Sequence, residues 1–208
     1  MIALAPQAAL AAGTLAALSL GLMRRPPAWA LRAVAAASIA AAMLCVTWTP
    51  ILELVSPILK SDVKSVSWQY LICLGSLPLA FWLDGKDDVM TALFLGSTLG
   101  MCLLASAANL PMLFIALEFM SLPAYLLVAR SRPDGRGLEA AIKYLVPGGF
   151  AAGVLTLGIS FVYGATGTLA FSGVATFGPT VTGLPLFALG IFLILATMGF
   201  KVSLVPFH

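Results

Sequence analysis

Apolar runs of about twenty residues recur along the whole chain, and they constrain its fold more than any other feature. A helix of that length crosses the roughly 30 Å hydrocarbon core of a bilayer. The 208 residues are 61% hydrophobic and 9% charged, whereas soluble domains carry about 25% charged residues. A globule of this size cannot bury so much apolar surface. We therefore predict an all-α fold, a multi-pass transmembrane helix bundle of about seven helices, forming a single membrane domain over residues 1–208.

The apolar runs place seven predicted spans along the chain, of which the third is the shortest. Between the second and third spans, residues 50–66 contain two prolines and charges of both signs. This composition indicates a loop or an interfacial segment. The predicted spans are about 2–22, 28–49, 67–83, 89–108, 110–129, 138–163 and 185–207.

Lysine and arginine indicate the orientation, because cytoplasmic loops of membrane proteins carry an excess of both. No basic residue precedes the first apolar run, which argues against a signal peptide. With the N-terminus outside, seven basic residues fall on one side of the membrane and two on the other, and we predict that the first side is cytoplasmic. The two groups are Arg24, Arg25, Arg32, Lys86, Arg130, Arg132 and Arg136 against Lys60 and Lys64.

Four ionisable residues lie inside or at the rim of the predicted spans: Glu118, Glu139, Lys143 and Lys201. A charged side chain at mid-bilayer costs roughly 2.5–3.5 kcal/mol, so such residues commonly mark ion or proton pathways. Glu118, near the middle of its span, is interpreted as a proton-relay or ion-path carboxylate, or else as half of a structural ion pair. Lys201 either pairs inside the bundle or extends its ammonium to the interface.

Lys143 follows Glu139 by four residues, in the order that favours a helical ion pair. The pair is either an interfacial salt bridge or part of a proton entry or relay site. Prolines also follow the three deepest charges and break backbone hydrogen bonds next to them. Charge beside broken backbone is typical of mid-membrane polar sites in several transporters. These prolines are Pro123, Pro147 and Pro206.

The remaining candidate residues give weaker signals. His208 is the only histidine and the last residue; it could pass protons near neutral pH, although chain ends are normally frayed. Cys45, Cys73 and Cys102 are isolated within apolar runs. They have no metal-ligand or redox spacing, so we predict small core side chains. No metal site, hydrolytic site or redox centre is visible, and no basic patch interleaved with aromatic residues suggests nucleic acid.

Two pairs of glycines are spaced four residues apart within predicted spans. They are Gly96 with Gly100, and Gly149 with Gly153. Small residues at this spacing let helix backbones approach closely. Both pairs therefore predict helix packing faces.

Three segments resemble subunit N of proton-pumping NADH–quinone oxidoreductase, respiratory complex I, in the antiporter-like membrane subunit family. They are LEFMSLPAYLLVA, GLEAAIKYLVPGGFAAGVLTLGISFVYGATGTL and GFKVSLVPFH, and together they cover roughly the last hundred residues. The resemblance implies that Glu118 is the family's carboxylate on the fifth helix and Lys201 its partner lysine on the seventh. It implies that Lys143 is the sixth-helix lysine and that His208 opens the broken part of the seventh helix.

The resemblance further implies a proton-translocating subunit, part of an NADH:quinone oxidoreductase, with no redox centre of its own. Quinone reduction elsewhere in the complex would separate Glu118 from Lys201 and release a proton, while Lys143 would load protons from the cytoplasm. No cofactor or metal is expected in this chain; quinone, NADH, flavin and iron–sulfur clusters are expected in other subunits. The expected partners are other membrane subunits of complex I and the lipid bilayer, not nucleic acid, and the expected location is the bacterial inner membrane.

Members of the family continue past the last matching segment, so the chain is expected to correspond to the N-terminal portion of such a subunit. Peripheral helices are expected within residues 1–83 and an incomplete antiporter-like bundle within 89–208. Pro147 departs from the aliphatic residue expected there. Two alternatives stay open: a membrane subunit of a cation/proton antiporter or a membrane-bound hydrogenase, and a structural membrane scaffold.

Overall fold

Long helices account for most of the protein. The computed structural model describes residues 4–22, 27–48, 52–83, 87–132, 135–177 and 183–205. The described residues form a multi-pass, all-α bundle, as predicted from the sequence. Its helices are α1 (Ala5–Leu22), α2 (Ala28–Trp48), α3 (Val63–Trp82), α4 (Asp88–Ala105), α5 (Leu110–Arg130), α6 (Arg136–Thr166), the short α7 (Phe171–Ala175) and α8 (Leu184–Lys201).

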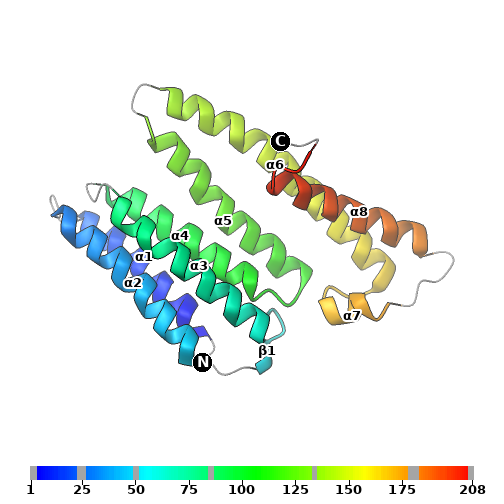
Figure 1. Ribbon diagram of the computed structural model, residues 1–208. Coiled ribbons are helices and arrows are strands. Elements are labelled where there is room, and N and C mark those ends of the chain that lie inside the picture. The colour runs from blue at the N-terminus through cyan, green and yellow to red at the C-terminus, as the bar shows by residue number, and fades with distance from the viewer. Residues whose placement is uncertain are drawn as a thin grey trace.

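The helices are arranged around α4 and α5 (Figure 1). Helix α4 packs against α1 and α3 on one side and against α5 on the other. Helix α5 then contacts α6, and α8 packs against the second part of α6. The connection between α5 and α6, near Arg130 and Arg136, lies at one end of the bundle, which we call the arginine end. The opposite end carries the strands β1 (Leu52–Ser56) and β2 (Leu59–Ser61) and is called the hairpin end.

Six of the helices are long and apolar enough to cross a membrane, namely all the long ones except α3. Tryptophan nevertheless marks both ends of the antiparallel pair α2 and α3. Trp29 and Trp82 are exposed toward the arginine end, and Trp48 and Trp68 toward the hairpin end. Tryptophan is enriched at both membrane interfaces. This pattern supports the prediction that α3 also spans the bilayer.

The described part of residues 50–66 forms an antiparallel hairpin followed by the first turn of α3. The sequence analysis predicted a loop or an interfacial segment there and missed the hairpin. Helix α3 begins at Val63, four residues before the predicted start at 67. The cause is local: the Asp62 carboxylate accepts a hydrogen bond of 2.7 Å from the backbone N–H of Ser65. Aspartate is among the best residues for capping a helix N-terminus in this way.

Backbone hydrogen bonds tie the hairpin to the connection between α4 and α5, and the start of α5 to the segment after α6. Lys60 donates its N–H to the carbonyl of Ser106 at 2.8 Å, and Leu110 donates to the carbonyl of Leu169 at 2.9 Å. The Asn109 side chain donates to the carbonyl of Pro57 at 3.1 Å and caps α5 through the N–H of Met112. These bonds fix the hairpin end of α5 relative to the segment that follows α6.

Only one of the two predicted glycine pairs makes a close helix contact. A Cβ atom on Gly100 would lie 2.5 Å from the backbone nitrogen of Met120, so α4 and α5 approach closely there. The prediction for Gly149 and Gly153 is wrong for the described residues, because nothing lies within 4 Å of a Cβ on either. Both glycines lie on the face of α6 that points away from the rest of the described chain, and spacing alone does not reveal which face is covered.

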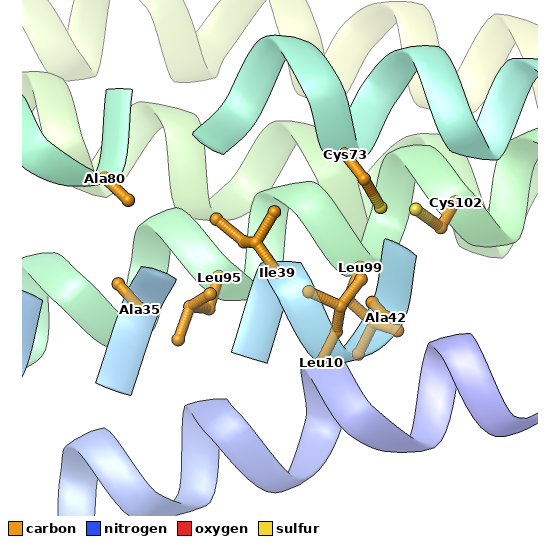
Figure 2. Close-up of a cluster of buried hydrophobic side chains, with 9 residues drawn as sticks. All are labelled: Leu10, Ala35, Ile39, Ala42, Cys73, Ala80, Leu95, Leu99 and Cys102. Atoms are coloured by element: carbon orange, nitrogen blue, oxygen red, sulfur yellow. The ribbon is translucent and has the colours of Figure 1, made fainter. Parts of the chain in front are cut away.

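The buried core between α1, α2, α3 and α4 consists of small and aliphatic side chains (Figure 2). It contains two of the cysteines, Cys73 from α3 and Cys102 from α4, and their side chains point toward one another. Both are free thiols and completely buried. They are core side chains, as predicted, but the sequence did not indicate that the fold brings them into contact.

Candidate functional site

An ion pair between α5 and α8 joins Glu118 and Lys201, the two least exposed charged residues of the described ion pairs. The Nζ atom of Lys201 lies 3.2 Å from Oε1 of Glu118. The two side chains are only 8% and 19% exposed, respectively. The residues are 83 positions apart in the sequence, so the fold alone brings them together.

The pair lies deep along the helix axis of α5. Glu118 follows the start of α5 by eight residues and precedes its end by twelve, which at 1.5 Å per residue is about 12 Å and about 18 Å. Lys201 contacts this central part of α5. Of the two predictions for Lys201, the structure contains the pairing inside the bundle, not an ammonium that extends to the interface.

Helix α8 ends directly after Lys201, whereas the sequence predicted a span to residue 207. The N–H of Leu204 donates to the carbonyl of Gly199 at 2.8 Å, and that of Ser203 donates to Phe200 at 3.0 Å. With Ser203 in the left-handed region at φ 54°, this is a Schellman motif, a common helix stop. Lys201 thus occupies the last turn of α8, where the helix dipole favours a positive charge.

A second glycine contact, missed from the sequence, sets the distance between α6 and α8. A Cβ atom on Gly190 would lie 2.9 Å from the carbonyl oxygen of Gly158, and a Cβ on Gly158 would lie 2.9 Å from that of Gly190. The two backbones can therefore approach only because neither residue has a side chain. This contact holds α8 against α6 and so helps to place Lys201.

Lys201 has a second oxygen partner that the sequence analysis missed. Its Nζ donates to Oγ of Ser121 at 2.8 Å. Ser121 in turn donates its hydroxyl to the carbonyl of Leu117 at 2.7 Å. The signal was present in the sequence, because Ser121 follows Glu118 by three residues and so lies on the same face of the helix.

Proline and serine shape the backbone of α5 near the pair. Pro123 lies inside α5, and a proline cannot donate to the carbonyl four residues earlier, here that of Phe119. One residue further on, the carbonyl of Met120 accepts a hydrogen bond of 3.1 Å from the hydroxyl of Ser97 on α4. The backbone next to Glu118 is thus more polar than that of an uninterrupted helix.

A cavity of about 440 Å³ opens beside Lys201 between α4, α5, α6 and α8. Water occupies about 30 Å³ per molecule in the liquid, so the cavity has room for several. Tyr125 and Tyr144 line it with their rings 4.8 Å apart in an edge-to-face arrangement. Its lining residues are Ser97, Met120, Ser121, Ala124, Tyr125, Tyr144, Pro147, Phe200, Lys201 and Ser203.

The cavity lies on the arginine-end side of the ion pair. Tyr125 is seven residues closer than Glu118 to the end of α5 at Arg130, about 10 Å along the helix. Gly148 makes room for this tyrosine, because a Cβ there would lie 2.2 Å from the Tyr125 hydroxyl oxygen. The ring of Tyr125 also lies 6.0 Å from Nζ of Lys201, at the limit of a cation–π contact.

Lys143 is placed differently from Lys201. Its Nζ lies 2.6 Å from Oε1 of Glu139, and the two side chains are 74% and 65% exposed. The helical pair expected from the spacing is present, but neither residue lines the cavity beside Lys201. The next residue, Tyr144, does line that cavity.

Two of the predicted residues, His208 and Pro206, lie outside the described residues. Pro147 lines the cavity on the α6 side. Within the described ranges, no three histidine, cysteine, aspartate or glutamate side chains gather as a candidate metal site. The arrangement brings together a partly buried carboxylate, a partly buried ammonium and, beside the ammonium, a cavity lined in part by hydroxyl groups.

Comparison with known proteins identifies the second half of the chain. Residues 107–208 match the family described as NADH:quinone oxidoreductase/Mrp antiporter, TM. The chain is 44% identical over 117 residues to NADH-quinone oxidoreductase subunit N from Cytophaga hutchinsonii, covering 56% of this chain and 25% of the relative. It is 37% identical over 161 residues to the subunit N from Methylococcus capsulatus, covering 74% of this chain and 33% of the relative.

The fold also matches a solved structure of respiratory complex I from Thermus thermophilus. The TM-score is 0.84 at 32% sequence identity, over 98% of this chain and 45% of the matching chain. The chain thus spans between a quarter and a half of the length of these similar proteins. The resemblance to subunit N, and to the N-terminal portion of it, is confirmed.

Proposed function

We propose that the chain, whose residues 107–208 match the family described as NADH:quinone oxidoreductase/Mrp antiporter, TM, works as a proton-translocating part of an NADH–quinone oxidoreductase. The observation that carries the proposal is the partly buried ion pair between Glu118 and Lys201, whose Nζ and Oε1 atoms are 3.2 Å apart. In this proposal the chain does no redox chemistry. Other subunits would hold the NADH, flavin, iron–sulfur and quinone sites.

The opening and closing of the ion pair would control the proton on Lys201. Two unit charges about 4 Å apart attract by about 4 kcal/mol at an effective dielectric constant of about 20. Separating the charges would remove this attraction and so favour release of the proton from the ammonium. Quinone reduction in neighbouring subunits would drive that separation.

The path of the proton follows from what lies beside Lys201. The cavity lined by Tyr125 and Tyr144 would give Lys201 a hydrated route toward the arginine end, which we propose faces the cytoplasm. Lys143, on the same half of α6, would collect protons from that side. His208 would be the next group after Lys201, as the family resemblance implies. The N-terminus would then face the outside of a bacterial inner membrane.

Replacing Glu118 by glutamine in the assembled complex tests this function. The variant keeps the size of the side chain but removes its charge, so we expect proton pumping to fall steeply while electron transfer continues. Pumping and NADH oxidation are measured together in sealed membrane vesicles. Unchanged pumping would remove Glu118 from the mechanism.

Asp87→Asn is a matched control for that experiment. Asp87 forms an ion pair with Arg130 between the arginine ends of α4 and α5, so the control also breaks an ion pair between α5 and a neighbouring segment. Asparagine remains a good helix cap, and Asp87 does not line the cavity beside Lys201. We expect this variant to pump normally.

A cation/proton antiporter or a membrane-bound hydrogenase is the second candidate. The family description itself joins quinone oxidoreductases with Mrp antiporters, and such proteins could use the same buried pair. Affinity purification of the chain from its native membrane distinguishes the candidates, because each predicts different copurifying subunits: those of complex I, those of a hydrogenase, or those of an antiporter.

A further inference from the structure

We propose that Ser121 is a positioning residue. It holds the Lys201 ammonium at the edge of the cavity beside Lys201 when the ion pair with Glu118 opens. The inference rests on the proposed proton-translocating function. In this inference Ser121 is a second, uncharged hydrogen-bond partner of Lys201, beside the charged partner Glu118.

The first observation is the geometry at Nζ of Lys201. The distance to Ser121 Oγ is 2.8 Å, shorter than the 3.2 Å to Glu118 Oε1. Both oxygens project from α5, three residues apart, so one ammonium can bind both at once. A loss of the carboxylate contact therefore still leaves the ammonium with a short hydrogen bond.

The second observation is the direction of the Ser121 hydroxyl. It donates its hydrogen to the carbonyl of Leu117 at 2.7 Å, so toward Lys201 it presents a lone pair. A hydroxyl has one hydrogen to donate and two lone pairs. Ser121 thus accepts a hydrogen bond from Lys201, and that bond is stronger when the lysine is charged.

The third observation is the location of the two ligands relative to the cavity. Ser121 and Lys201 line it, whereas Glu118 is not among the described residues that do. The ammonium thus has a carboxylate on the side away from the cavity and a serine hydroxyl at the cavity. When the ion pair opens, the existing bond to Ser121 keeps the ammonium beside the cavity through which, in the proposed function, Lys201 receives its proton.

The test compares serine variants in the assembled complex. A hydrogen bond to a charged group is worth enough to change an equilibrium about tenfold or more, so we expect Ser121→Ala to slow proton pumping by about that factor at unchanged assembly. Ser121→Thr keeps the hydroxyl and is expected to restore pumping. A merely structural role for Ser121 would not predict that restoration.

Ser160→Ala is the matched control. Ser160 makes the same kind of bond as Ser121, donating to the carbonyl four residues earlier, that of Thr156, at 2.9 Å. It lies exposed on α6 and does not line the cavity. We expect its replacement to leave pumping unchanged.

Glu118→Gln, measured in parallel, separates the two proposals. If Glu118→Gln abolishes pumping while Ser121→Ala pumps normally, the role of Ser121 is overturned and the proposed function stands. Equal losses in Ser121→Ala and Ser121→Thr would also overturn it, because the hydroxyl would then be irrelevant. If Glu118→Gln pumps normally, the proposed function itself fails.

Discussion

Lys201 keeps a charged group deep in the bundle because several independent features compensate it. The carboxylate of Glu118 pairs with the ammonium, and the hydroxyl of Ser121 accepts a hydrogen bond from it. Lys201 also lies in the last turn of α8, where the helix dipole favours a positive charge. A buried charge with a single partner is strongly destabilised when that partner is lost. A charge with several compensating groups can tolerate the temporary loss of one, as a site that repeatedly opens and closes requires.

Gly100 and Gly153 give contrasting predictions for the same substitution. Gly100→Ala would place a Cβ 2.5 Å from the backbone of Met120. Overpacking of this kind costs about 1–3 kcal/mol, so the thermal unfolding midpoint in detergent should fall. Gly153→Ala meets nothing within 4 Å, and alanine favours a helix over glycine by up to about 1 kcal/mol. The unfolding midpoint of this variant should stay the same or rise. An equal fall of the midpoint in both variants would contradict the described packing of α4 on α5.

Lys143 can be removed with little structural effect. Exposed helical ion pairs contribute about 0.3–0.5 kcal/mol, so Lys143→Gln and Glu139→Gln should both assemble normally. If Lys143 loads protons, only Lys143→Gln should slow pumping in vesicles. A loss of similar size in both variants would show instead that pumping depends on the ion pair between Lys143 and Glu139, not on a proton carried by Lys143.

At the scale of elements, helix ends position much of the site. Helix α8 stops after Lys201 through a Schellman motif, and α5 starts at Leu110 under the side chain of Asn109. Helix α3 starts at Val63 under the side chain of Asp62. Two of these ends, those of α3 and α8, differ from the predicted span boundaries, because hydropathy records where a segment is apolar and not where its backbone hydrogen bonds end.

The cap of α3 gives a pH prediction. Burial raises the pKa of the Asp62 carboxyl, but the hydrogen bond from the Ser65 N–H and the nearby Lys60 ammonium outweigh burial, so the pKa lies below the ordinary 3.8. Because the folded pKa is the lower one, the carboxylate stabilises the start of α3 above the ordinary value, and this stability is lost as the pH falls through the folded pKa. Hydrogen exchange at the Ser65 amide, corrected for intrinsic rates, should show protection that drops only below about pH 4.

Asp62→Asn is the control for the pH prediction. Asparagine caps helices about as well as aspartate but does not titrate. Its protection at the Ser65 amide should therefore be independent of pH in the same range. A pH-dependent loss in the asparagine variant would assign the effect to some other group.

The charged and the uncharged residues of the site differ in how well the sequence predicted them. Glu118 and Lys201 could be predicted because a charge within an apolar run is itself unusual. Ser121 gave only a weak signal, its position three residues after Glu118, since serines in membrane helices commonly bond only their own backbone, as Ser160 does. The contact of Gly158 with Gly190 was also hidden, because it joins single glycines on two helices and involves no repeated spacing within either.

For the whole molecule, the ends of the bundle differ in charge. Arg130, Arg132 and Arg136 lie at the arginine end, and Lys60 and Lys64 lie at the hairpin end. The sequence predicted this partition because antiparallel helices place alternate loops on opposite sides. It did not predict the hairpin bonds that link residues 58–60, 106–110 and 169–171, because long-range backbone pairing leaves no local pattern in these short segments.

Two single-cysteine variants on a cysteine-free background test the orientation. Lys64→Cys and Arg132→Cys lie at opposite ends of the bundle, and both positions are exposed. If the hairpin end faces outward, a membrane-impermeant thiol reagent should label position 64 in intact cells and position 132 only in inverted vesicles. The opposite labelling pattern would reverse the orientation, and with it the direction proposed for proton entry.

The central claim, that Glu118 and Lys201 move a proton as one unit, is tested most directly by a double-mutant cycle on pumping. The ratio of protons pumped to electrons transferred is measured in sealed vesicles for Glu118→Gln, Lys201→Gln and the double variant. Residues that act as a unit are strongly non-additive, so the account predicts that each single variant loses pumping and that the double variant loses no more than either. Normal pumping in the singles, or losses that multiply in the double variant, would contradict it.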